Sequence, residues 1–214
     1  MRYTTLLFDL DGTLTDSGLG IMRCAQYALD HFGIHVEDYT TLRCFVGPPL
    51  EDSFIDFYGF TSEQAGEAVR VYRERYFTTG VYENEVYPGT VEALTELQRR
   101  GYRMGIASSK NLPMVREVLR YFDLARFFDF TAARDEAGLL HSKADVLQDV
   151  IKREQLDLQK TLMIGDRYHD IEGAHKVNLP AMGILWGGYG TREEMEEYDA
   201  EYIVETWQQL LDVL

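Results

Sequence analysis

Residues 4–13 read Thr-Thr-Leu-Leu-Phe-Asp-Leu-Asp-Gly-Thr, and they carry the first indication of the fold. It begins with a short apolar and β-branched run, typical of a buried strand, and it ends in two acidic residues and a glycine. Because side chains alternate along a strand, we expect Asp9 and Asp11 to point the same way at its carboxyl end. Gly12 then permits a tight turn. An isolated Asp-x-Asp after a strand usually only begins a loop, so its meaning depends on the rest of the chain.

From residue 87 onward, segments with strand character alternate with segments of helical periodicity. The strands are predicted at 102–107, 128–131, 162–164, 181–185 and 202–204, and the helices around 91–97 and 115–122 and at 142–153, 170–177, 191–198 and 206–213. Capping-box patterns open the last two helices, Thr191 with Glu194 and Thr206 with Gln209. The alternation predicts an α/β fold, a Rossmann-like parallel sheet flanked by helices, with ligands at the carboxyl ends of the strands.

Residues 16–85 follow another pattern, with apolar positions at helical spacing near 21–32 and 65–76 and no convincing strand. Thr61 and Gln64 form a capping-box pattern ahead of the second of these helices. We therefore expect an α/β core made of residues 1–15 and 86–214, and an all-helical domain of residues 16–85 inserted after the first strand.

The composition narrows the class of protein. The 214 residues are 45% hydrophobic and 27% charged, and Asp plus Glu outnumber Lys plus Arg by 36 to 21, a net charge of −15. Such a field repels polyanions, so we expect no nucleic acid polymer as a partner. No apolar stretch approaches the ~20 residues of a membrane span, and the apolar start is too short for a signal peptide. Cys24 and Cys44 make no CxxC or zinc pattern, which favours a reduced, cytoplasmic protein.

A second predicted strand, 162–164, also ends in acid, as Gly165-Asp166, and Asp170 follows in the first turn of the next helix. The carboxyl ends of parallel strands meet at one edge of a sheet, so at least three carboxylates, from Asp9, Asp11, Asp166 and Asp170, can converge there. Crowded carboxylates need a compensating cation. Oxygen ligands without His or Cys favour Mg²⁺ over zinc.

One further strand end and one helix start carry polar or charged groups that could bind an anion. Ser108 and Ser109 follow the predicted strand 102–107, and their hydroxyl and amide groups suit phosphate oxygens. A lone serine there is more often a helix cap. Lys143 lies at a helix start, where the helix dipole disfavours a cation, so a fixed anion nearby would explain it; a solvated surface lysine is the alternative.

In chain order, Asp9-Leu10-Asp11-Gly12-Thr13, Ser108, Lys143 and Gly165-Asp166 with Asp170 resemble the haloacid dehalogenase superfamily of phosphohydrolases, over nearly the whole chain. Three more stretches resemble its phosphoglycolate phosphatase and 5′-nucleotidase branch: Phe45-Val46-Gly47-Pro48-Pro49-Leu50, Tyr87-Pro88-Gly89 and Gly165-Asp166-Arg167. The family's Thr-Ser-Lys-Pro appears here as Ser108-Ser109-Lys110-Asn111, which keeps the hydroxyl and lacks the proline.

The resemblance implies a Mg²⁺-dependent phosphatase that hydrolyses small phosphate monoesters, 2-phosphoglycolate-like or nucleoside monophosphates, through an aspartyl-phosphate. It implies that Asp9 attacks phosphorus, that Asp11 is the general acid and base, and that residues 16–85 form a cap hinged near 12–16 and 80–87. Substrate phosphate would bind to Ser108, Ser109 and Lys143. Mg²⁺ would bind to the Asp9 side chain, the Asp11 backbone carbonyl and Asp166, with Asp170 acting through water. We expect a small phosphorylated metabolite as the partner, and a monomer or homodimer.

Other enzymes of the same superfamily are alternatives. A phosphomutase shares the core chemistry, and His31, His35 and Arg43 could orient a sugar. Phosphonate-cleaving relatives use a lysine in the cap, but this chain has no lysine before Lys110. Dehalogenating relatives lack the second acid, which is present here as Asp11.

Two alternatives belong to other functional classes. A phospho-Asp receiver domain also combines acids, Mg²⁺ and a lysine, but the insertion of about seventy residues and the second acid argue against it. A phosphate-binding protein without catalysis is disfavoured because the expected catalytic side chains are present. The loop at residues 186–190 follows a predicted strand end, so its Trp186 could contact a nucleobase.

Overall fold

The structure is a computed structural model, and it describes residues 2–135 and 140–214. Contacts within the chain divide it into two compact units. One consists of Met1–Thr15 with Val86–Leu214, here called the α/β unit, and the other of Asp16–Glu85, here called the helical unit.

The α/β unit is built on a six-stranded parallel sheet with the strand order β5-β4-β1-β6-β7-β8. The strands are β1 (Thr5–Phe8), β4 (Arg103–Asn111), β5 (Phe130–Arg134), β6 (Thr161–Gly165), β7 (Ala181–Ile184) and β8 (Tyr202–Val204). In this register Phe8, the last residue of β1, pairs with Ile106 on one side and Ile164 on the other. The residues that follow these three positions therefore lie at one edge of the sheet.

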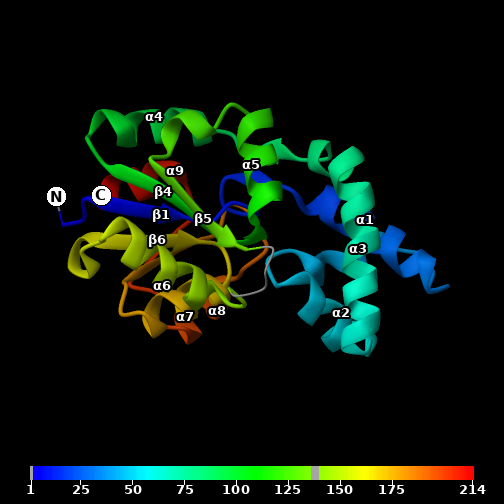
Figure 1. The fold of residues 1–214 in the computed structure, drawn as a ribbon. Coiled ribbons are helices and arrows are strands. Elements are labelled where there is room, and N and C mark those ends of the chain that lie inside the picture. The colour runs from blue at the N-terminus through cyan, green and yellow to red at the C-terminus, as the bar shows by residue number, and fades with distance from the viewer. Residues whose placement is uncertain (1, 136–139) are drawn as a thin grey trace. The chain divides into compact units, whose positions relative to one another are not determined.

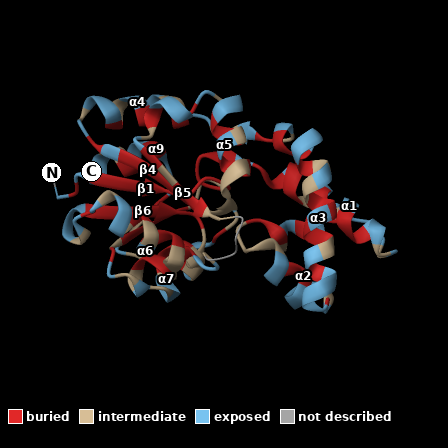
Figure 2. Cartoon of the chain, viewed as in Figure 1, coloured by how far each residue is buried: buried red, intermediate tan, exposed pale blue. Residues whose placement is uncertain are grey.

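Helices cover both faces of this sheet (Figure 1). They are α4 (Thr90–Arg99), α5 (Leu112–Tyr121), α6 (Lys143–Glu154), α7 (Tyr168–Lys176), α8 (Arg192–Glu197) and α9 (Trp207–Val213), with 3₁₀ turns η3 (Ala125–Phe127) and η4 (Leu158–Lys160). In Figure 1, α4 and α5 lie on one side of the sheet and α6 and α7 on the other. Every residue of β1 and β6 is buried, as Figure 2 shows in red, which explains why these strands are continuous apolar runs. The predicted fold class is confirmed.

Two strands differ from their predicted bounds by more than one residue at an end. The strand predicted at 128–131 is β5, which begins two residues later, because a 3₁₀ turn occupies Ala125–Phe127 and the Asp129 carboxylate accepts a hydrogen bond from the Met104 amide. The strand predicted at 102–107 is β4, which continues to Asn111 through an irregular register after Ser108. Ser108 is therefore part of a strand end, and the N-cap of α5 is Asn111.

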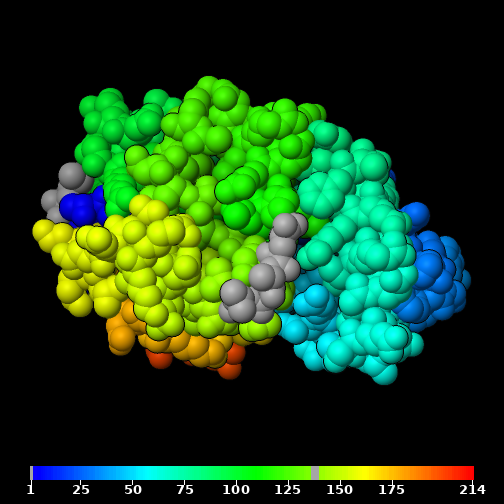
Figure 3. All heavy atoms as spheres, viewed as in Figure 1, coloured from blue at the N-terminus to red at the C-terminus, as the bar shows by residue number. Residues whose placement is uncertain are grey.

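The helical unit contains α1 (Gly18–His31), η1 (Tyr39–Phe45), α2 (Leu50–Tyr58), α3 (Ser62–Thr78) and η2 (Gly80–Tyr82). The predicted capping box at Thr61 and Gln64 is present at the start of α3. In the space-filling view, α3 runs along the face of this unit that is turned to the viewer (Figure 3). Two-residue strands, β2 (Thr15–Asp16) and β3 (Glu85–Val86), pair at the borders of the segment, where no strand was predicted. Two residues are too few to show a period of two.

Over the described part of the chain, no helix is both long enough and apolar enough to cross a membrane.

Candidate active site

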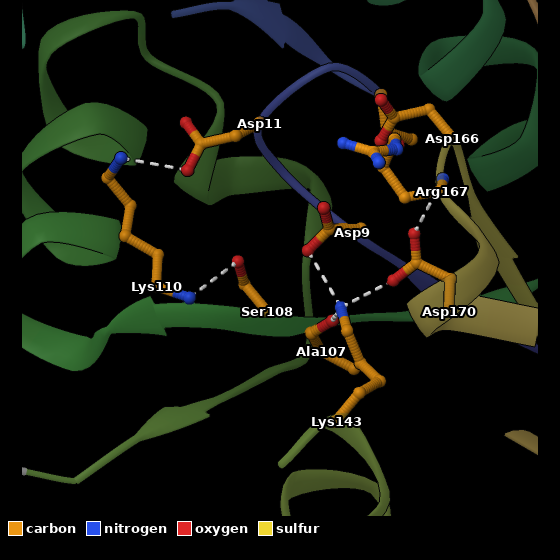
Figure 4. Close-up of polar contacts among 10 residues, drawn as sticks. Asp9, Asp11, Ala107, Ser108, Lys110, Lys143, Asp166, Arg167 and Asp170 are labelled. Carbon is orange, nitrogen blue, oxygen red and sulfur yellow. Dashed lines mark hydrogen bonds and ion pairs between the residues drawn. The ribbon is translucent and has the colours of Figure 1, made fainter. Parts of the chain in front are cut away.

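Three buried carboxylates meet at the carboxyl edge of the sheet (Figure 4). Asp9 follows β1, Asp166 follows β6, and Asp170 lies in the first turn of α7. One carboxylate oxygen of each lies within 4.8 Å of those of the other two. The parallel register of β1 and β6 brings Asp9 and Asp166 side by side, as the sequence predicted for the ends of these strands.

The carboxylate of Asp11 is not part of this group, which corrects the expectation that Asp9 and Asp11 point the same way. The strand ends at Phe8 and the chain then turns, with the amides of Thr13, Leu14 and Thr15 all donating to the Leu10 carbonyl. The alternation of side chains that holds along a strand does not hold through such a turn. Figure 4 shows the Asp11 side chain directed toward Lys110 instead.

Lys143 is the cation at the centre of the site. Its Nζ lies 2.9 Å from Asp9 Oδ1 and 2.7 Å from Asp170 Oδ1, and it donates a 2.7 Å hydrogen bond to the Ala107 carbonyl. The side chain is 3% exposed. The structure thus places two fixed anions beside a lysine at a helix start, and the surface-lysine alternative is excluded. The capping box of Ser142 and Asp145 holds the start of α6 in place.

Burial controls the protonation of these groups. Loss of solvation raises the pKa of Asp9 to about 6, although the nearby Lys143 ammonium acts in the opposite direction. Burial and the neighbouring carboxylates of Asp170 and Asp9 raise the pKa of Asp166 well above its ordinary value. Burial by itself would lower the pKa of Lys143, but its contacts with Asp170 and Asp9 raise it. Lys143 therefore stays charged, and the pKa values of Asp9 and Asp166 lie above their ordinary values because the effect of burial outweighs that of the nearby positive charge.

The two oxygens of the Asp166 carboxylate differ in their hydrogen bonding. Thr13 Oγ1 donates to Asp166 Oδ1 at 3.2 Å, whereas Asp166 Oδ2 is buried and has no hydrogen-bond partner among residues 2–135 and 140–214. Gly12 has a φ of +83°, and a Cβ there would lie 2.1 Å from Asp166 Oδ2. Clustered carboxylate oxygens, one of them without a hydrogen-bond partner in the described residues, fit a hard divalent cation.

A second ion pair at the site was not predicted from the sequence. Lys110 Nζ donates to Asp11 Oδ2 at 2.8 Å, and the two side chains are 6% and 10% exposed. The amide of Lys110 also donates to Ser108 Oγ at 3.3 Å, so the end of β4 connects Ser108 with Asp11. Ser109, which lies between Ser108 and Lys110 in the chain, is half-buried. The only signal for Lys110 in the sequence was its place directly after the two serines.

The loop after β6 is held by α8. Glu194 Oε1 accepts from the amide of Tyr168 at 2.7 Å and from Arg167 Nε at 3.1 Å. One half of the predicted capping box is present, since the Thr191 side chain accepts a hydrogen bond from the Glu194 amide. The Glu194 carboxylate binds the loop after β6 instead of returning to the helix N-cap. Asp170 Oδ2 accepts from the Arg167 amide at 3.2 Å, so Asp170 is bonded through both oxygens.

Comparison with known proteins agrees with this geometry. The sequence model of the haloacid dehalogenase-like hydrolase family matches residues 6–184 of this chain. A 5′-nucleotidase of Pseudomonas aeruginosa is 39% identical over 198 residues, which are 92% of this chain and 89% of that protein. The crystal structure of a predicted phosphatase from Clostridium acetobutylicum has a TM-score of 0.95 and 39% identity, covering 98% of this chain and 97% of that one.

One similar protein carries a different activity in its name. The tyrosine-protein kinase PtkA of Mycobacterium tuberculosis is 33% identical over 192 residues, covering 90% of this chain and 65% of that protein. The family match over residues 6–184 and the relatives that span nearly the whole chain confirm the resemblance found in the sequence. The chain belongs to the haloacid dehalogenase-like hydrolases and is a phosphatase of that family.

Proposed function

We propose that this protein is a Mg²⁺-dependent phosphatase that hydrolyses small phosphate monoesters through a phosphorylated Asp9. The observation that carries the proposal is the position of Lys143, whose Nζ contacts Asp9 and Asp170 beside the unpartnered oxygen of Asp166. A carboxylate held by a buried ammonium next to a cation site is suited to attack a phosphate dianion, because the positive charges offset the repulsion between the two anions.

Asp9 is the nucleophile in this proposal. Lys143 binds Oδ1 of Asp9 and so fixes the orientation of the carboxylate, which leaves the other oxygen to attack. That oxygen forms a bond to phosphorus while the bond between phosphorus and the leaving oxygen breaks. Water then attacks the phosphorus of the aspartyl-phosphate, which releases inorganic phosphate and restores Asp9.

Asp11 is the proton donor and acceptor. It gives a proton to the leaving oxygen in the first step and takes one from the attacking water in the second. Its Oδ2 is held by Lys110, and its Oδ1 is buried with no hydrogen-bond partner in the described part of the chain. Oδ1 is therefore the oxygen that we assign to proton transfer.

The phosphate group would be bound by Ser108 Oγ, the amide of Ser109 and Lys143. Ser108 is 2% exposed, at the end of β4. Lys143 reaches the same edge of the sheet from α6 and bonds to the carbonyl of Ala107, the residue before Ser108. A hydroxyl, an amide and an ammonium are the donors that phosphate oxygens require.

The residues that would hold Mg²⁺ are Asp9 and Asp166 through their side chains and Asp11 through its backbone carbonyl. When bound, Mg²⁺ supplies positive charge that stabilises the phosphate oxygens during transfer. We assign Asp170 an indirect role, because its two oxygens already bind Lys143 and the Arg167 amide. We also assign the helical unit the role of a cap domain and the α/β unit that of the catalytic core.

Among substrates, the proposal favours nucleoside monophosphates over 2-phosphoglycolate. The support is the 5′-nucleotidase of Pseudomonas aeruginosa, which aligns over 92% of this chain. Both substrates are small monoesters, which agrees with a net charge of −15 that disfavours longer polyanions.

The test is release of inorganic phosphate from nucleoside monophosphates, 2-phosphoglycolate, sugar phosphates and an aryl phosphate, with and without Mg²⁺. We expect release that needs Mg²⁺ and falls at least about a thousandfold in Asp9→Asn, which keeps the shape but removes the nucleophile. The variant Glu92→Gln, on α4, is an exposed acid-to-amide control and should retain activity.

Other outcomes would overturn the proposal. Transfer of phosphate between two sugar positions without release would indicate a mutase. Transfer from ATP to a tyrosine would indicate a kinase activity like that named for PtkA. A phosphorylated Asp9 that persists for hours after treatment with acetyl phosphate would indicate a receiver.

A further inference from the structure

The segment Trp186–Gly190, two residues after the end of β7, lies against both loops that carry the proposed metal-binding acids. Trp186 Nε1 donates a 2.9 Å hydrogen bond to the backbone carbonyl of Thr13, in the loop that follows Asp9 and Asp11. The ring of Trp186 packs on that of Trp207, with 4.3 Å between centroids. The indole is therefore held on one side by Trp207 and bonded at its N–H to the first acidic loop.

Two glycines bring the same segment into close contact with the acidic loops. A Cβ at Gly187 would lie 2.1 Å from the Gly12 carbonyl oxygen, and a Cβ at Gly190 would lie 2.0 Å from the Asp166 carbonyl oxygen. Both distances are far shorter than a carbon–oxygen contact permits. The segment thus touches the backbone of Gly12 and of Asp166, which come from different strands.

Thr13 connects this contact to the metal-binding carboxylate. The residue is fully buried, and its Oγ1 donates to Asp166 Oδ1 at 3.2 Å. That bond occupies Oδ1 and leaves Oδ2, the oxygen without a partner in the described residues, for a cation. Trp186, Thr13 and Asp166 therefore form a chain in which the indole fixes the backbone of the residue whose hydroxyl orients the carboxylate.

We propose that Trp186 is a positioning residue that sets the affinity of the site for a divalent cation through Thr13. The inference rests on the proposed function for the existence of the cation site, and it replaces the nucleobase contact as the role of this loop. Groups that orient a metal ligand without touching the metal change metal affinity about 10- to 100-fold when removed. Trp186 acts through one intermediate residue, so we expect an effect near the lower end.

Trp207 provides a matched control. Its Nε1 is buried and has no hydrogen-bond partner within residues 2–135 and 140–214, whereas the N–H of Trp186 has one. Trp186→Phe and Trp207→Phe each keep an aromatic ring in the packed pair, but only Trp186→Phe removes a hydrogen bond to the acidic loop. A difference in Mn²⁺ affinity between the two variants is therefore due to the hydrogen bond from Trp186 to Thr13, because the loss of ring volume is the same in both.

The experiment measures direct binding of Mn²⁺, as a paramagnetic substitute for Mg²⁺, by electron paramagnetic resonance and calorimetry in the whole chain. We expect Trp186→Phe to raise the Kd for Mn²⁺ about tenfold and Trp207→Phe to leave it within about twofold. Thr13→Val, which removes the hydroxyl and keeps the shape, should also weaken binding. The double variant should bind no more weakly than the weaker single variant, because both changes act on one chain of contacts.

Thermal unfolding of the metal-free variants separates positioning from general loss of packing. Equal Mn²⁺ affinity in Trp186→Phe and wild type would overturn the inference, as would equal weakening in Trp186→Phe and Trp207→Phe with equal loss of Tm. Additive effects of the Trp186 and Thr13 changes would also overturn it. A wild-type protein that binds no Mn²⁺ would instead overturn the metal site of the proposed function.

Discussion

Lys143 Nζ lies 2.9 Å from Asp9 Oδ1, and both side chains are more than nine-tenths buried. The two residues are 134 positions apart in the chain and come from α6 and the end of β1. Together with Asp170 they form a buried cluster of two carboxyl groups and one ammonium. The stability of this cluster can be measured in the metal-free protein without a substrate.

Lys143→Met should destabilise the metal-free protein. Removing one partner of a buried ion pair leaves an uncompensated charge and typically costs about 3–5 kcal/mol. We expect a loss of about 3 kcal/mol in the free energy of unfolding at pH 7, measured with urea in the presence of a chelator. The loss of stability should be smaller at pH 5, because Asp9 is then protonated and no longer carries a charge that the Lys143 ammonium offsets. Lys152→Met, at an exposed position on the same helix, should change little, and equal losses in the two variants would contradict this.

The pKa of Asp9, about 6, predicts how the metal-free stability depends on pH. Because this pKa lies above its ordinary value of 3.8, the folded chain binds the proton more tightly than the unfolded chain does. The stability from this group is therefore greatest below about pH 4 and decreases as the pH rises to about 6. Asp9→Asn is neutral at every pH, so its stability relative to wild type should increase on the order of 2 kcal/mol between pH 4 and pH 7. Parallel curves for the two proteins would show that Asp9 ionises normally.

Gly12→Ala should damage both stability and metal binding. The positive φ of Gly12 disfavours any side chain by about 1–2 kcal/mol, and the Cβ would also displace the Asp166 carboxylate. Gly33→Ala is the matched control, since Gly33 has a φ of +73° and nothing within 4 Å of a Cβ. We expect about 1 kcal/mol of destabilisation at position 33, at least twice that at position 12, and loss of Mn²⁺ binding only at position 12. Unchanged Mn²⁺ affinity in Gly12→Ala would place the cation away from Asp166.

Lys110→Met should lower kcat without changing metal affinity. Lys110 holds Asp11 Oδ2 at 2.8 Å, and Asp11 is the proposed acid and base, whose full contribution is typically about 10²–10⁴-fold. If Asp11 is no longer held in place, part of this rate contribution is lost. We expect kcat to fall about tenfold or more, with a smaller change in KM. Lys110→Arg keeps the charge and should recover part of the rate. If KM rose and kcat stayed constant, Lys110 would be a substrate-binding group instead.

The fold class and the site-bearing strand ends could be predicted from sequence because each depends on local pattern. A buried strand followed by acid occurs at both Asp9 and Asp166, and βα alternation predicts that such ends share one edge of the sheet. The expectation that the Asp11 side chain points the same way as that of Asp9 was wrong because the turn at Leu10 overrides the alternation of side chains. The start of β5 was misplaced for a similar reason, since a 3₁₀ turn and the Asp129 side chain occupy its expected first residues.

Strand and helix periods are local properties of the chain, so the sequence could predict which chemical groups stand at the ends of the strands. The partners of those groups follow from the folded chain alone: Lys143 with Asp9, Lys110 with Asp11, and Trp186 with Thr13. These pairs are separated by 134, 99 and 173 residues, respectively. They form because the sheet order β4-β1-β6-β7 and the packing of α6 bring the ends of distant strands and the start of that helix to one edge of the sheet. Which strands are neighbours depends on the packing of the whole sheet and its helices, and no local pattern contains that information.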